Sequence, residues 1–414
     1  MKPPSRVVPV YPTFAGLGRL SPSRSTAAQQ EPIPESEPVV RRGRLSTQWQ
    51  TWFPFSARHG RWAFSGRVAL YHGLPALKLP PGSTILVPNY HQGVEIDTLL
   101  TAGYRLRYYR VDQSLGIDLR DAGQRLDDTV SALYVIHYFG FAQPMAAVRE
   151  FCRSHRLKLI EDCALSLFSR QDDVWLGSDG DLALFSVYKT LPLPHGGFVV
   201  TKVEPPTSAL RSPPFGSTLV QTEDLIRQAL RAGGWAAADR WASSLAAGVS
   251  RLIHWDRTRT FTSGGASWDP RLLGKAASRW VTGLMRLIDR DRVVARRRRN
   301  FERLAARLRG HVPCPFPELP AETCPLFFPI MVPDKGRFQQ DLAGLGVESV
   351  NLWDASHPTC PPDLAAEVAH WRRHCLELPI HQELNEEAID RVATAVLRVL
   401  ETQRSRSAEV PSAP

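Results

Sequence analysis

Two side chains with complementary chemistry follow apolar segments in the middle of the chain. The segment Leu157–Ile160 leads into Asp162, and the segment Leu182–Tyr188 leads into Lys189. Short apolar runs bounded by polar and glycine residues predict buried β-strands. Ligands of open α/β sheets bind beside the carboxyl ends of the strands. The pattern therefore predicts a carboxylate and an amine at one edge of a sheet.

An acid and a lysine in this arrangement suit pyridoxal phosphate. The amine can hold the cofactor covalently, and the acid can pair with its pyridinium nitrogen. A strand-end lysine is also typical of a solvated surface, and an aspartate at the start of a loop is typical of a turn. The spacing alone leaves both interpretations open.

The motifs around these two residues narrow the choice. In chain order they read Ile160-Glu161-Asp162-Cys163-Ala164, Gly177-Ser178-Asp179-Gly180-Asp181, Phe185-Ser186-Val187, Lys189 and Gly196-Gly197. This order resembles the DegT/DnrJ/StrS family of pyridoxal-phosphate aminotransferases, from about Phe64 to about Leu400. The resemblance implies that Asp162 pairs with the pyridinium nitrogen, that Lys189 holds the cofactor and moves the proton, and that Ser186 bonds to the phosphate.

A second implied site element precedes a helical pattern that starts at Val68. Ser65-Gly66-Arg67 resembles the family's phosphate-binding turn, with Arg67 in place of a threonine. The free N–H groups of a helix N-terminus can bind phosphate, and an arginine can pair with it bidentately. The alternative is an ordinary helix cap beside an exposed arginine.

The polar loop after the expected strand 84–88 takes the place of the aromatic residue that, in the family, stacks on the cofactor ring. By strict count Gln92 falls on that position, and Tyr90 and His91 are the alternatives. Farther along, Arg271 resembles an arginine that reaches the active site of the partner subunit. The resemblance implies that Arg271 binds phosphate or substrate across a dimer interface.

The sequence departs from the family pattern at three places near Lys189. Lys189 follows Val187-Tyr188 directly, whereas the family usually has two more residues before the lysine. Leu165 stands where a glutamine or histidine is frequent, and His195 stands where an acid precedes the glycine pair. The retained lysine argues against the dehydrase branch of the family, in which it becomes histidine.

Chain length and the alternation of strand and helix patterns predict two domains in an α/β fold. The resemblance implies a fold-type-I pyridoxal-phosphate transferase, with a large, mostly parallel sheet domain over 46–285 and a smaller α+β C-terminal domain over 286–402. The pattern over residues 205–267 predicts a divergent helical connection. Residues 1–45, rich in proline, serine and arginine, predict an irregular arm, with a transit peptide as the alternative, and 403–414 predict a loose tail.

Composition bears on the expected ligands and the expected cellular location. The six cysteines form no C-x-x-C pair, so we expect neither a metal site nor disulfides, and we expect a cytoplasmic location. A net charge of +10 permits anionic ligands. The run Arg296–Arg299 predicts a solvated or interface helix face rather than a nucleic-acid site. No apolar run is long enough to predict a membrane span.

The resemblance implies a homodimer with its active sites at the subunit interface. The expected reaction moves an amino group from an amino acid donor, glutamate in the family, to the keto group of a nucleotide-linked sugar or a similar small ketone. Donor, acceptor and regiochemistry stay open. The alternative is a divergent or non-enzymatic relative with a regulatory or scaffold role. Asp162 and Lys189 speak against it, and Arg67, Gln92 and Leu165 speak for it.

Overall fold

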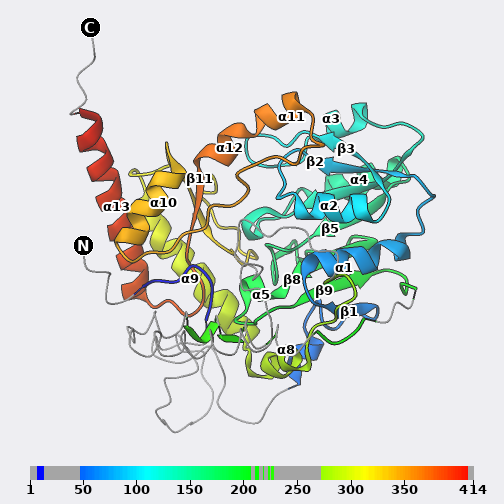
Figure 1. Ribbon diagram of the computed structural model, residues 1–414, viewed down its shortest axis with the longest axis horizontal. Coiled ribbons are helices and arrows are strands. Elements are labelled where there is room, and N and C mark those ends of the chain that lie inside the picture. The colour runs from blue at the N-terminus through cyan, green and yellow to red at the C-terminus, as the bar shows by residue number, and fades with distance from the viewer. Residues whose placement is uncertain are drawn as a thin grey trace, which may run out of the picture.

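A twisted sheet forms the centre of the larger part of the molecule (Figure 1). The computed structural model describes residues 7–13, 47–206, 210–213, 218, 222–223, 225–227 and 272–408. Within these residues the sheet has seven strands in the order β1-β9-β8-β5-β4-β2-β3. From β8 to β3 the strands run parallel, and β9 is antiparallel to both β8 and β1. The strands are β1 (Gly60–Ala63), β2 (Thr84–Pro88), β3 (Arg105–Tyr109), β4 (Val130–Ile136), β5 (Lys158–Asp162), β8 (Leu182–Ser186) and β9 (Gly197–Thr201).

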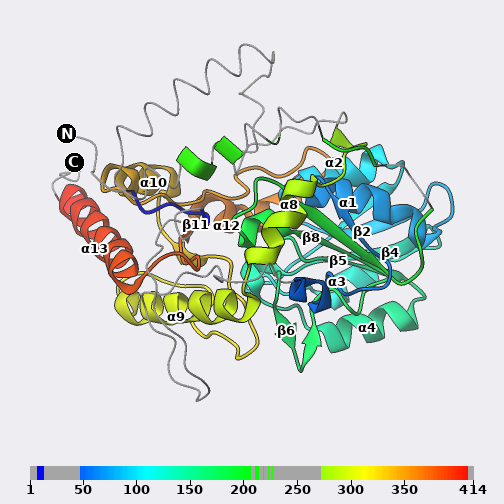
Figure 2. The ribbon, with the colours of Figure 1, turned by 90° about the horizontal axis from the view of Figure 1, so that it is seen from below.

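Helices cover both faces of this sheet, as Figure 2 shows for α1 and α2 on one side and α4 on the other. The strands alternate accordingly. Ile85 and Val87 of β2 belong to the core under α1 and α2, whereas Leu86 belongs to the core with α4. Side chains on a strand point alternately to opposite faces, so a strand that is apolar throughout is buried on both. The helices here are α1 (Gly66–Gly73), α2 (Val94–Thr101), α3 (Leu119–Gln124), α4 (Met145–Ser154) and α5 (Val187–Thr190).

The C-terminal part forms a second layer system. A two-stranded antiparallel sheet of β10 (Phe328–Met331) and β11 (Cys375–Leu378) packs with long helices, and α9 lies along α13. The helices of this part are α8 (Arg279–Leu284), α9 (Arg290–Leu308), α10 (Lys335–Gly344), α11 (Pro362–Glu367), α12 (Ala369–His374) and α13 (Glu386–Ala408). A small hairpin, β6 (Arg170–Gln171) and β7 (Val174–Trp175), completes the described strands. None of the helices in the described ranges is long and apolar enough to cross a membrane.

The described residues 7–13 of the expected N-terminal arm dock on the C-terminal part of the same chain. Val8 bridges Val347, and Thr13 donates hydrogen bonds from N and Oγ1 to Oε2 of Glu383 at 2.8 and 2.9 Å. Residues 14–46 lie outside the described ranges, as does most of the expected connection over 205–267.

The structure differs from the sequence predictions in several elements. The strand expected over Leu182–Tyr188 ends at Ser186, and the chain turns at once into α5. The run Arg296–Arg299 was predicted to form a solvated or interface helix face, and the solvated alternative is wrong for Arg296 and Arg297, which are buried. Helix α13 continues to Ala408, into the segment expected to be a loose tail.

Candidate active site

The carboxyl ends of β4, β5 and β8 meet at one edge of the sheet. The strand register pairs Ile136 with Asp162 and Asp162 with Leu184. Two residues beyond Leu184, β8 ends at Ser186, and α5 carries Lys189 directly after it. The structure therefore brings Asp162, Ser186 and Lys189 to the same edge. Lys189 lies on a helical turn rather than at a strand end, because α5 begins at Val187, directly after Ser186.

Asp162 is held by two donors in a buried position. The hydroxyl of Tyr134 donates to Oδ2 at 2.6 Å, and the backbone N–H of Ala164 donates to Oδ1 at 2.8 Å. Burial raises the pKa of Asp162, while these two bonds and the charge of Lys189 oppose the rise. The two donors favour the ionised carboxylate. This is the form that can accept a hydrogen bond from a protonated ring nitrogen.

Charged side chains of both signs act on the Lys189 amine. Burial lowers the pKa of Lys189 and the charge of Arg67 adds to this, whereas Asp162 and Glu95 oppose it. A lysine with a lowered pKa is more often neutral near pH 7, and the neutral amine is the nucleophilic form. Lys189 is half-buried.

A tight corner at the start of α1 faces the end of β8. Ser65 is the N-cap residue of α1, but its side chain makes no capping bond. Its Oγ is buried and has no hydrogen-bond partner among the described residues. At Gly66 a Cβ atom would come within 2.4 Å of Ser186 Oγ, so a larger residue there would force the Ser186 side chain to move. A helix N-terminus beside a buried hydroxyl that lacks a hydrogen-bond partner is a suitable binding site for an anion.

Arg67 follows in the first turn of α1 and is half-buried. Burial raises the pKa of Tyr188 and lowers that of Lys189; the charge of Arg67 opposes the first shift and adds to the second, so its guanidinium lies near the α5 turn. The predicted group Gly66, Arg67, Ser186 and Lys189 is thus assembled in one region.

The loop after β2 gives its three candidates different environments. The ring of Tyr90 is fully buried among Tyr138, Trp353 and Trp371. These contacts give Tyr90 a packing role between the two parts of the molecule, so we no longer expect it to stack on a cofactor. His91 and Gln92 stay candidates.

His91 is fully buried, and both its ring nitrogens have backbone partners. Nε2 accepts from the N–H of His357 at 3.0 Å, which leaves Nδ1 protonated to donate to the carbonyl of Pro88 at 3.0 Å. Burial and the charge of Arg372 lower the pKa of His91 to about 3, so the ring is neutral. Gln92 is half-buried, and its N–H donates to Oε1 of Glu95 at 2.8 Å.

The sequence reasoning missed Glu95, in the first turn of α2. Its carboxyl group is buried, and burial followed by the charge of Asp162 raises the pKa of Glu95 to about 7, against the effect of Lys189. Glu95 is therefore a second carboxylate of the site. An acid in the first turn of a helix at the binding edge of a sheet was the available signal. It is easily passed over, because such acids commonly stabilise helix N-termini.

Other predicted positions lie elsewhere or outside the structure. Arg271 is outside the described residues. Leu165 is buried in the core under α1 and α2. His195 is buried and stacks on Phe64 with ring centroids 4.6 Å apart, and burial lowers its pKa to about 4.

His137, Glu161 and Cys163 gather close together beneath the same edge, with ligand atoms within 4.8 Å of one another. Their polar atoms already serve the backbone. His137 Nδ1 accepts from the N–H of Gln143 at 3.1 Å, its Nε2 lies 3.1 Å from Glu161 Oε2, and that oxygen also accepts from the N–H of Gly177 at 2.8 Å. We assign the group to fixing the loops of the sheet edge.

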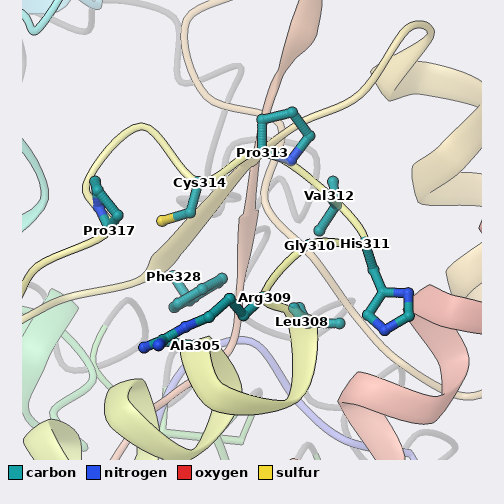
Figure 3. Close-up of a pocket in the computed structure, with 10 residues that line it drawn as sticks. All are labelled: Ala305, Leu308, Arg309, Gly310, His311, Val312, Pro313, Cys314, Pro317 and Phe328. Carbon is teal, nitrogen blue, oxygen red and sulfur yellow. The ribbon is translucent and has the colours of Figure 1, made fainter.

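A separate cavity of about 370 Å³ lies in the C-terminal part, shown in Figure 3. It opens at the end of α9, and its lining includes Leu308, Arg309, His311, Pro313, Cys314 and Phe328. At 1.5 Å per residue, Leu308 is about 16 Å along the helix from Arg297, which reaches the Lys189 turn. The cavity is therefore distinct from the candidate active site.

Solved structures of known proteins share this fold. Over 88% of the chain the structure resembles an aminotransferase involved in the biosynthesis of pseudoaminic acid from Helicobacter pylori, with a TM-score of 0.59 and 15% identity, covering 93% of that chain. The fold is that of the pyridoxal-phosphate-dependent aminotransferases, which confirms the predicted α/β fold class.

The sequence comparison gives the family. Residues 55–212 match the model of the DegT/DnrJ/EryC1/StrS aminotransferase family. The match covers the region that holds the motifs around Asp162 and Lys189, so the resemblance inferred from these motifs is confirmed.

Two curated relatives match over a similar length. The chain is 27% identical over 168 residues to GDP-perosamine synthase of Vibrio cholerae, which is 39% of this chain and 46% of the relative. It is 30% identical over 136 residues to dTDP-4-dehydro-2,3,6-trideoxy-D-glucose 4-aminotransferase of Saccharopolyspora spinosa, which is 32% of this chain and 35% of the relative. The matches span less than half the length of either relative.

Proposed function

We propose that this protein is a pyridoxal-phosphate-dependent aminotransferase. The observation that carries the proposal is the placement of Asp162 and Lys189 on neighbouring elements at the binding edge of this fold. Each residue has the environment its role requires: the acid has donors that favour its ionised form, and the amine has a lowered pKa.

The residues at this edge fit pyridoxal phosphate. Three features suit the phosphate: the buried Oγ of Ser65, which has no partner in the described part of the chain, the N-terminus of α1 and the space beside Gly66. Arg67 would be its cationic partner. Asp162 suits the ring nitrogen. Ser186 lies against Gly66, next to the proposed phosphate site formed by Ser65, Gly66 and Arg67. When bound, the cofactor supplies an aldehyde that captures amines and a protonated ring that withdraws electrons from the reacting carbon.

The side chains of this chain then have separate tasks. Lys189 would hold the cofactor, and its neutral amine would act as the base that takes a proton from the substrate carbon and as the acid that gives it back. Asp162 keeps the ring nitrogen protonated, and Tyr134 keeps Asp162 ionised. Glu95 adds negative charge that favours a protonated Lys189.

The names of the relatives support a substrate class. One relative is a GDP-perosamine synthase and another is a 4-aminotransferase of a dTDP-keto-sugar. We propose a nucleotide-linked keto-sugar or similar small ketone as acceptor and an amino acid, glutamate first, as donor. A homodimer with Arg271 reaching the partner's site is part of the proposal. The free thiols of all six cysteines support a reducing compartment such as the cytoplasm.

The test is the visible absorbance of purified protein with added pyridoxal phosphate, followed by borohydride reduction and peptide mapping. A yellow protein with the label on Lys189 is expected. Lys158→Gln is the matched control, because Lys158 is an exposed lysine paired with Asp181, and it should label at Lys189 as the unmodified protein does. Amino transfer from glutamate to a panel of nucleotide-linked keto-sugars then identifies the acceptor.

A protein that stays colourless and unlabelled at saturating pyridoxal phosphate would refute the proposal. That result would instead favour the non-enzymatic relative. A labelled protein that transfers no amino group would leave the cofactor assignment standing and exclude transamination of the acceptors tried.

A further inference from the structure

The helical turn that carries Lys189 is too short to be stable by itself. Helix α5 comprises only Val187–Thr190, and an isolated helix of one turn does not persist in water. At its start, the N–H of Val187 donates to the carbonyl of Gly196 at 2.9 Å. The direction of the Lys189 side chain therefore depends on what holds the other end of the turn.

Two side chains from the C-terminal part bind that other end. The carbonyl of Thr190 accepts from Nη2 of Arg297 at 2.9 Å and from Nε2 of Gln382 at 3.0 Å. Arg297 Nε also donates to Gln382 Oε1 at 2.8 Å. The guanidinium, the amide and the carbonyl form a closed triangle directly after Lys189. Arg297 lies on α9, and Gln382 lies between β11 and α13.

Arg297 is an unusual residue to find in this place, because only 1% of its surface is exposed. Its remaining bonds go to the carbonyls of Leu326 at 2.9 Å and Pro325 at 3.3 Å, and no carboxylate of the described residues forms an ion pair with it. Burial lowers the pKa of Arg297 to about 10, so it stays charged at neutral pH. A buried cation without an ion pair is costly, and Cys324 and Glu383 oppose only part of the fall in its pKa. An apolar residue would avoid that cost.

The fork of a guanidinium offers what an apolar residue cannot. Its rigid plane of N–H donors binds several acceptors in a fixed geometry. Here it ties the end of α5 to the strand-bearing segment at Pro325 and Leu326 and to Gln382. We propose that Arg297 and Gln382 are positioning residues for Lys189: by holding the Thr190 carbonyl they fix the direction from which the amine meets the cofactor. The inference rests on the proposed function only in taking Lys189 as the cofactor-binding residue.

The same hydrogen bonds connect the C-terminal part of the molecule to the turn that carries Lys189. Both donors belong to the part of the chain that carries β11, α9 and α13. The position of that part relative to the large sheet is thereby linked to the position of Lys189.

The test uses one substitution on each side of the triangle. Gln382→Glu keeps an acceptor for Arg297 Nε and supplies it with a carboxylate, but it removes the donor to Thr190. Arg297→Lys keeps the charge and loses the fork. Arg299→Lys is the matched control, because Arg299 is a half-buried arginine on the same helix that makes none of these bonds.

Three readouts separate positioning from stability. The first is the melting temperature, the second is the dissociation constant for pyridoxal phosphate, and the third is the limiting rate at which acetic anhydride labels Lys189 in cofactor-free protein. The limiting rate is taken at high pH, where the amine is neutral in every variant. Peptide mapping assigns the label to Lys189.

Gln382→Glu is expected to melt no lower than the unmodified protein, to bind pyridoxal phosphate at least tenfold more weakly and to label at least threefold faster. Arg297→Lys should change binding and labelling in the same direction, and Arg299→Lys should change neither. Folded Gln382→Glu and Arg297→Lys proteins with binding and labelling within twofold of the unmodified protein would overturn the proposal. Loss of folding in both would also overturn it, by assigning the pair to stability alone.

Failure of the proposed function gives a different pattern. In that case pyridoxal phosphate would not attach to Lys189 of the unmodified protein. The labelling of Lys189 without cofactor would still report whether Arg297 and Gln382 position it.

Discussion

The hydroxyl of Tyr134 lies 2.6 Å from Oδ2 of Asp162 and donates a hydrogen bond to it. Tyr134 is on β4 and Asp162 ends β5, so the bond joins adjacent strands at the binding edge. The donor stabilises the ionised carboxylate and opposes the rise in the pKa of Asp162 that burial causes. A buried acid can thereby stay ionised where a pyridinium nitrogen needs it.

Tyr134→Phe should therefore weaken the binding of pyridoxal phosphate. A hydrogen bond to a charged group contributes about 1.5–3 kcal/mol, so we expect the dissociation constant at pH 7 to rise roughly tenfold or more. Because the pKa of Asp162 rises in the variant, the loss should be larger at pH 6 than at pH 8. Equilibrium dialysis at the three pH values measures it.

Tyr109→Phe is the matched control for that substitution. The Tyr109 hydroxyl donates to the backbone carbonyl of Tyr134 at 2.9 Å and touches no carboxylate. Equal weakening in both variants, with no dependence on pH, would show that the Tyr134 hydroxyl acts through packing alone.

Glu95→Gln tests the carboxylate that the sequence reasoning passed over. The charge of Glu95 raises the pKa of Lys189, so its removal should lower that pKa and shift the pH midpoint of Lys189 labelling in cofactor-free protein downward. Asp97→Asn serves as the control, because Asp97 lies on the same helix but binds His357 at 3.1 Å. An unshifted midpoint in Glu95→Gln would place Glu95 outside the electrostatic field of Lys189.

Gly66→Ala should weaken the proposed phosphate site at the start of α1. The added Cβ would lie 2.4 Å from Ser186 Oγ, and overpacking of this kind costs about 1–3 kcal/mol. We expect the dissociation constant for pyridoxal phosphate to rise roughly 10- to 100-fold, with a modest loss of melting temperature. Gly344→Ala is a fair comparison, because a Cβ there meets nothing within 4 Å. Unchanged cofactor binding in Gly66→Ala would argue against a phosphate at this site.

Local patterns predicted the large sheet well. The predicted strand 84–88 coincides with β2, because the apolar run that forms it and the turn signals that bound it lie within a few residues of each other. The neighbourhood of Asp162, Ser186 and Lys189 followed from the order of the motifs. The α5 turn did not follow, because its hydrogen bonds reach Gly196, Arg297 and Gln382, which are remote in sequence.

Burial of charged residues was the main thing that the sequence concealed. Arg297 sits in a run of arginines that reads as a solvated face, yet it is fixed by carbonyls from other segments. Tyr90 appeared as a candidate for ring stacking, and only the approach of Trp353 and Trp371 from the C-terminal part makes it a packing residue. Tertiary contacts of this kind leave no periodic signal.

Glu377 of β11 should make the stability of the protein depend on pH. It is fully buried, and burial raises its pKa from 4.5 to about 8, against the hydrogen bond from the N–H of Leu352 and the charge of Lys335. Between these values the folded protein holds a proton that the unfolded chain has lost, so this contribution to stability falls as the pH rises from about 4.5 to about 8 and is constant above. Glu377→Gln removes the titration, and its melting temperature relative to the unmodified protein should be higher at pH 8 than at pH 5. Glu401→Gln, an exposed substitution on α13, should show no such difference. Parallel pH profiles for Glu377→Gln and the unmodified protein would mean that Glu377 is ionised in the folded state.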